Sequence, residues 1–268
     1  MSLKEPYQTI SNKLYELLID KRCEGRTTWL YLDINGFLHT GIGMNLEPST
    51  PSENTVRLQQ QKTTPPINAK PKEMTGKVYD LVWKKGGKLV TNRHIIYQAV
   101  WKVRLLGIRD SSIYASGSAK AFEGKTDIEV DVAVIRREFD AGVAMRISVL
   151  KRYFSQFDTF PADARLAMLV HSWAMHPRMN SEGILVAGKS QTKWVHYTNA
   201  IAARRWWGAQ PSADPEERTV AEECHWRGMS EYRYKNMVEM YRQAYKVEEN
   251  RKKGIAADLD TVHWVKLP

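Results

Sequence analysis

The chain has 268 residues, 43% of them hydrophobic and 26% charged, which is an ordinary composition for a soluble globular protein of one elaborated domain or two small ones. No apolar run approaches the about 20 residues of a membrane span, and the first residues lack the apolar core of a signal peptide. The net charge of +10 favours polyanionic partners: nucleic acid, an anionic membrane surface or the acidic polymers of a bacterial wall.

Residues 7–22 have the apolar spacing of an amphipathic helix, with Ile10, Leu14 and Leu18 on one face. Gly25 is a natural stop just beyond it. This predicts Glu24 at the C-terminal end of the helix. The helix dipole disfavours an anion there, so we expect a raised pKa for Glu24, as a general acid requires.

Residues 28–44 change to a strand pattern. Residues 29–32 are β-prone, 33–36 form a candidate turn, and 37–40 form a second short strand that ends in Gly41-Ile42-Gly43. The expected hairpin brings Asp33 back toward Glu24. Asp33 also suits the first position of a β-turn, a purely structural role that can coexist with a chemical one.

The remainder is divided by a proline-rich segment, residues 47–73, which holds five of the eleven prolines and is expected to be a surface loop or flap. A short strand pair is expected around Gly86-Gly87. The other patterns predict helices, over residues 94–106, from 128 to about 154, 161–173, 194–207, near 220 and 229–249. A helix, a small β element and a mostly helical remainder define an α+β protein.

Glu24 and Asp33 stand nine positions apart on either side of an apolar, aromatic run. Two carboxylates in different environments are what glycoside hydrolysis needs, because one stays protonated as the acid while the other stays ionised. An isolated Glu and Asp at this spacing are common. Their position beside a helix end, with Gly25, Gly36 and the Gly-Ile-Gly turn, favours an active site.

These residues resemble the signature of phage-type lysozymes, the T-even-phage-like muramidases of glycoside hydrolase family 24. The matching positions are Glu24-Gly25, Asp33, Gly36 and Gly41-Ile42-Gly43, while residues 162–175 and 203–207 resemble later helical segments of the family. The resemblance implies a lysozyme-like fold with an N-terminal helix and catalytic hairpin (1–46), an inserted flap (47–124), a helical lobe (125–228) and a C-terminal helical extension (229–268). The insertion and the extension are departures from the family.

The resemblance implies hydrolysis of the β-1,4 bond between MurNAc and GlcNAc in peptidoglycan, with Glu24 as general acid. Asp33 would stabilise the oxocarbenium-like transition state and help to position water. The family threonine that holds this water is replaced by His39, with Thr40 next to it. His39 could orient or deprotonate the water in an inverting reaction or act in a retaining pathway, or Thr40 could hold the water.

Further expectations concern the substrate and partners. Tyr31 and Phe37 are candidates to line the cleft, and Gly41 and Gly43 would let the glycan approach the backbone. No metal or cofactor motif is present, and the two cysteines, Cys23 and Cys224, are expected to be thiols, although a long-range disulfide stays open.

Without a signal peptide, the protein is expected to be made in the cytoplasm and to act on peptidoglycan in the periplasm or wall of a target bacterium. A holin-released phage endolysin and a type VI secretion effector with an immunity protein both fit. Two other classes stay open: a non-catalytic wall-binding protein with the lysozyme fold, and a basic nucleic-acid-binding protein, although no reader motif accompanies the charge. No membrane insertion is expected.

Overall fold

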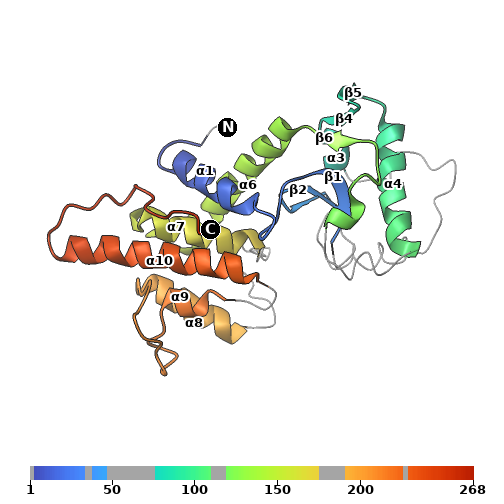
Figure 1. The fold of residues 1–268 in the computed structure, drawn as a ribbon. Helices are drawn as coiled ribbons and strands as arrows, with labels where there is room; N and C mark the ends of the chain where they lie inside the picture. Colours follow the sequence, from blue (N-terminus) through green and yellow to red (C-terminus); the bar gives the residue numbers. More distant parts are fainter. Residues whose placement is uncertain (1–2, 34–37, 47–75, 110–118, 175–190, 226–228) are drawn as a thin grey trace. The chain divides into compact units, whose positions relative to one another are not determined.

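The computed structural model describes residues 3–33, 38–46, 76–109, 119–174, 191–225 and 229–268 (Figure 1). The chain forms two compact units, one of residues 1–23 and 140–268 and the other of residues 24–139. The described part is mostly helical, with two small antiparallel sheets of three strands each. The predicted α+β class is therefore confirmed.

The first unit is helical. Its elements are α1 (Tyr7–Leu18), α6 (Val132–Tyr153, which begins in the other unit), η3 (Phe157–Thr159), α7 (Ala162–Ala174), α8 (Gln191–Ala202), α9 (Val220–Glu223) and α10 (Glu231–Lys252). Both α1 and α10 pack on α7 (Figure 1). Because α7 is covered on several sides, its described side chains are buried through Trp173. The segment from residue 161 was correctly predicted as a helix.

Helix α1 is shorter than predicted. It ends at Leu18, and a turn follows in which the amide of Cys23 donates to the carbonyl of Asp20 (2.9 Å). The carboxylate of Asp20 accepts hydrogen bonds from the backbone amide (2.9 Å) and the guanidinium (3.0 Å) of Arg22, which hold the pKa of Asp20 below its usual range. The side chain of Asp20 thus stabilises a turn in competition with the helix. The prediction that Glu24 lies at the helix end was wrong.

Helix α8 also stops early, at Ala202 and not near residue 207. Arg204 has a positive φ of 54°, which no helix can continue through. The chain then turns inward, and Trp206 becomes a core residue with 1% of its surface exposed. Helix α10 agrees with its predicted range, and its N-cap is Ser230, whose hydroxyl accepts from the amide of Arg233 (3.2 Å).

A C-terminal strap, residues 253–268, follows α10 without further helix. The buried carboxylate of Asp163 accepts hydrogen bonds from the amides of His263 (3.1 Å) and Trp264 (2.8 Å). The side chain of Asn236 accepts from the amide of Leu267 (3.0 Å). Trp264 is buried and belongs to the core of this unit, whereas the other residues of the strap are exposed or half-buried.

The second unit contains both sheets. Its elements are β1 (Thr27–Leu32), β2 (Leu38–Gly41), β3 (Met44–Asn45), α3 (Gly76–Asp80), β4 (Trp83–Lys85), β5 (Lys88–Val90), α4 (Arg93–Arg109), η2 (Ala119–Phe122) and β6 (Glu129–Val130). The strand orders are β1-β2-β3 and β5-β4-β6. The predicted first hairpin, the strand pair around Gly86-Gly87 and the helix near residues 94–106 are confirmed. The predicted flap, residues 47–73, lies outside the described residues.

Strand β1 is the centre of this unit, because α4, η2 and β6 all contact it. Two buried or half-buried tryptophans anchor neighbouring segments through their indole N–H groups. Trp29 donates to the carbonyl of Ala119 (2.8 Å) and Trp83 to that of Val78 (2.7 Å). The first bond ties β1 to η2 and the second ties β4 to α3, while Glu24 precedes β1 and Asp33 follows it.

Candidate functional site

The first hairpin brings together three of the candidate residues. Glu24 precedes β1 and Asp33 follows it, while His39 lies on β2 in register with Tyr31. Nε2 of His39 is 3.4 Å from Oδ2 of Asp33, within ion-pair distance. Their side chains are 12% and 27% exposed, so the contact is largely, but not completely, screened from solvent.

Tyr31 connects the two carboxylates. It is buried, and its ring centroid is 5.5 Å from that of His39. Burial first, and then the charges of Glu24 and Asp33, raise the pKa of Tyr31 well above its ordinary value. The phenol is thus neutral and close enough to both carboxylates to respond to their charge. Tyr31, predicted to line a cleft, is buried and lies close to both the candidate acid and Asp33.

Both ring nitrogens of His39 are buried and lack a hydrogen-bond partner among the described residues. At 3.4 Å the contact with Asp33 satisfies an ion-pair distance but not the geometry of a hydrogen bond. Buried polar atoms are nearly always paired in folded proteins, so a site that leaves them unpaired calls for a reason. A general base must come within hydrogen-bond distance of the water that it deprotonates, so these buried nitrogens would need access to water for that role.

The turn between β2 and β3 lies next to the carboxylate of Glu24. Gly43 has a positive φ of 61°, and a Cβ atom placed on it would lie 3.1 Å from Oε2 of Glu24. The backbone conformation favours glycine here, and any larger residue would also push the carboxylate of Glu24 by a few tenths of an ångström. The turn limits the positions that the Glu24 side chain can adopt.

Two of the other candidates make hydrogen bonds within the hairpin, and one lies outside the described residues. Thr40 is fully buried, and its hydroxyl donates to the carbonyl of Trp29 (3.0 Å). Gly41 is buried, and its carbonyl accepts from the hydroxyl of Thr27 (3.0 Å). Phe37 lies outside the described residues. Thr40 and Gly41 therefore hold the hairpin together, and only His39 of the adjacent pair contacts Asp33.

Other candidate chemistry finds less support. In the described ranges, no group of three or more His, Cys, Asp and Glu side chains is placed to hold a metal ion. The ring of His171 is buried and stacks on Tyr197, with ring centroids 4.4 Å apart. The thiol of Cys224 is buried and donates to the carbonyl of Ala221 (3.2 Å). None of the described helices is long and apolar enough to cross a bilayer.

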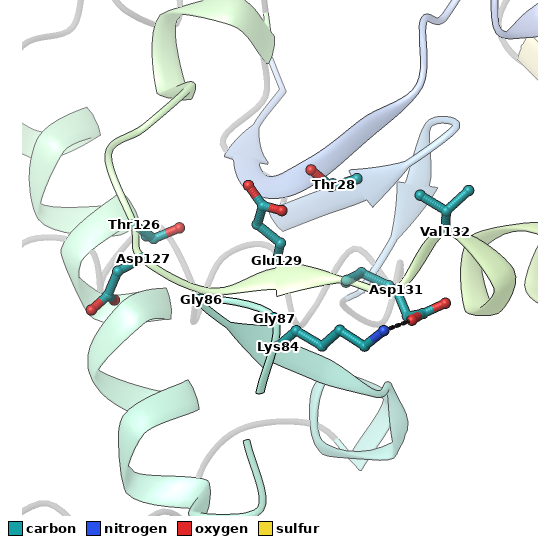
Figure 2. A pocket seen from close by; sticks show the side chains of 10 residues that line it. Thr28, Lys84, Gly86, Gly87, Thr126, Asp127, Glu129, Asp131 and Val132 are labelled. Atoms are coloured by element: carbon teal, nitrogen blue, oxygen red, sulfur yellow. Dashed lines mark ion pairs between the residues drawn. The ribbon is translucent and has the colours of Figure 1, made fainter. Parts of the chain in front are cut away.

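Sequence reasoning missed a pocket of about 390 Å³ at the second sheet (Figure 2). It is lined by β4, β6 and their flanking residues, and by Thr28 of β1. Two signals were present: the Gly86-Gly87 turn and the alternation of acids at Asp127, Glu129 and Asp131. Neither identifies a pocket unless β1 is known to lie beside β6, which is a contact between segments far apart in the chain.

Comparisons with known protein families, with characterised proteins and with solved structures found no match to this chain. The hairpin motif and the geometry of the site are therefore the features that point to a function.

Proposed function

We propose that this protein is a lysozyme-type glycoside hydrolase that cleaves the MurNAc-β-1,4-GlcNAc bond of peptidoglycan, on a lysozyme-like variant of the α+β fold. The observation that carries the proposal is the cluster built by one hairpin. Asp33 and His39 are in contact, and the buried Tyr31 lies close to both Asp33 and Glu24. An acid and a separate, differently surrounded carboxylate are the groups that this hydrolysis requires.

Glu24 is the proposed general acid that protonates the glycosidic oxygen. Asp33 is the proposed ionised partner that stabilises positive charge at the anomeric carbon. Neutral Tyr31 would keep water and mobile ions from the space beside the two carboxylates. Gly43 would support the acid by restricting the carboxylate of Glu24.

His39 is the proposed water-holding residue in the position where the lysozyme family has threonine. Its buried ring nitrogens make no hydrogen bond with the described residues, whereas the hydroxyl proton of Thr40 is donated to the backbone. A water activated by His39 and Asp33 would attack the face opposite the leaving group, which gives inversion. Proton NMR of the first product formed should show the α-anomer; a β-anomer as the initial product would contradict the inverting mechanism.

The charge of +10 supports a wall polymer as the target, because it would steer the protein to anionic peptidoglycan in a salt-dependent way. A phage endolysin and a secreted antibacterial effector both suit this activity. The effector setting adds a cognate immunity protein as a partner. Co-purification from the producing strain distinguishes the two, since only an effector retains a dedicated inhibitor.

The test of the function is digestion of purified sacculi, with the products separated and identified by mass spectrometry. The proposal predicts muropeptides with reducing MurNAc ends. Reducing GlcNAc ends, anhydro-MurNAc ends or cleaved stem peptides would each contradict it by assigning a different bond or reaction. Intact sacculi that nevertheless bind the protein would support the non-catalytic alternative.

A further inference from the structure

The pocket at the second sheet is a defined cavity within the second unit. Its volume of about 390 Å³ lies in the range of small-molecule sites and suits a ligand of one or two sugar or amino-acid residues. Figure 2 shows Glu129 and Thr28 reaching toward the same space from β6 and β1. Asp127 and Asp131 lie on either side of Glu129 along the chain.

Two of the three pocket carboxylates are neutralised by lysines. Asp127 forms an ion pair with Lys85, and Asp131 forms one with Lys84, which Figure 2 marks with a dashed line. These contacts hold the pKa values of Asp127 and Asp131 below their ordinary value, so both are ionised at neutral pH. Each pair therefore contributes no net charge to the pocket.

Glu129 is the carboxylate that lacks such a partner. It stands directly opposite Lys84 in the β4–β6 register, where an ion pair across the strands would be expected. The ammonium of Lys84 instead forms an ion pair with Asp131. Glu129 is exposed and makes no ion pair with any residue that the structure describes. Among the described pocket carboxylates, Glu129 is therefore the one whose charge no ion pair offsets, although the protein as a whole is strongly basic.

Neutral polar groups surround this carboxylate. Thr28 and Thr126 line the pocket with hydroxyl oxygens; Thr126 donates its proton to the carbonyl of Ile128 (3.4 Å) and so keeps its lone pairs as acceptors. The Gly86-Gly87 turn lines it with backbone groups and no side chains. One negative charge among several acceptors and donors fits a ligand with one positive charge and neighbouring hydroxyl or carbonyl groups.

We propose that this pocket binds a primary ammonium group on a small polar scaffold, with Glu129 as its counter-ion. Two sources carry this chemistry: an amino sugar with a free amine, and an amino-acid side chain that ends in an ammonium. The site is separate from the residues proposed for glycan cleavage, so ligand binding here does not depend on the proposed hydrolase function.

The test is a titration of the full-length protein followed by backbone amide NMR, with D-glucosamine, N-acetyl-D-glucosamine and Nα-acetyl-lysine methylamide as probes. Saturable shifts at Thr28, Thr126 and the Gly86-Gly87 turn are expected with at least one of the two amines. We expect that amine to bind at least fivefold more tightly than N-acetyl-D-glucosamine, which has the sugar but not the charge. Preference for glucosamine assigns an amino sugar, and preference for the lysine derivative assigns an amino-acid amine.

Glu129→Gln should weaken binding of the preferred amine at least fivefold, because it removes the charge and keeps the shape. The matched control is Glu123→Gln, an exposed position of the same unit that does not line the pocket. Both variants should keep the wild-type melting temperature. The proposal is overturned if neither amine shifts the pocket amides, if the acetylated sugar binds equally well, or if Glu129→Gln binds like the control.

Discussion

Gly43→Ala probes whether the turn between β2 and β3 fixes the carboxylate of Glu24. Two costs arise at this position. An alanine at a φ of 61° adopts the left-handed conformation at a cost of about 1 kcal/mol. Its Cβ would also stand 3.1 Å from Oε2 of Glu24, closer than ordinary van der Waals contact, so the carboxylate must move by a few tenths of an ångström.

The two costs can be separated with a matched variant. Gly124 has a similar φ of 68°, and a Cβ placed on it meets no heavy atom within 4 Å. Gly124→Ala should therefore lose about 1 kcal/mol of unfolding free energy without any effect on Glu24. Gly43→Ala should lose at least as much stability and, in addition, about tenfold in turnover, because small displacements of a catalytic group are costly.

Urea unfolding measures the stability of both variants, and release of soluble muropeptides from sacculi measures turnover. Turnover should be assayed where both variants are fully folded, so that a stability loss cannot appear as an activity loss. The reasoning fails if both variants are equally active. It also fails if Gly43→Ala is inactive but Glu24→Gln keeps wild-type turnover, because Glu24 would then not be needed for catalysis.

Three stability predictions concern the first unit. Thr219→Ala removes the capping box of α9 and should lower the unfolding free energy by about 1 kcal/mol in urea titration; no change would show that tertiary contacts alone hold this turn. Trp264→Ala should lower the unfolding free energy by about 3–5 kcal/mol, since this side chain is buried; a loss below about 1 kcal/mol would show that it is peripheral to the core. Burial raises the pKa of Asp163 above its ordinary 3.8 despite the backbone amides, so the folded state binds this proton more readily than the unfolded state. The stability that this group contributes is present below pH 3.8 and is lost as the pH rises through the folded pKa. Asp163→Asn should therefore reduce the change of unfolding free energy with pH, measured by urea titrations at several pH values. An unchanged pH dependence would contradict this role of Asp163.

The regular elements were the parts that sequence periodicity predicted well. The hairpin over β1 and β2, and the helices α4, α7 and α10, follow from apolar spacing and turn residues that act locally. Helix ends were less predictable. The end of α1 depends on hydrogen bonds between Asp20 and Arg22, which do not alter the apolar pattern.

The candidate site was predictable in its residues but not in its contacts. Asp33 and His39 were chosen from spacing, yet their contact depends on the pairing of β1 with β2, in which Tyr31 stands opposite His39 and a register shift follows between Thr27 and Tyr31. A bulge of this kind changes which side chains share a face, and sequence alone does not reveal it. The pocket of the second sheet was missed for a related reason, because it requires β1 and β6 to meet.

The central claim is that Glu24 is the general acid of a muramidase. The most direct test compares wild type, Glu24→Gln and the half-buried control Glu16→Gln for the rate at which sacculi release products with reducing MurNAc ends. Loss of a general acid predicts a fall of about 100-fold or more for Glu24→Gln, with the folded structure retained and the control unchanged. Release by Glu24→Gln within fivefold of the wild-type rate would contradict the account.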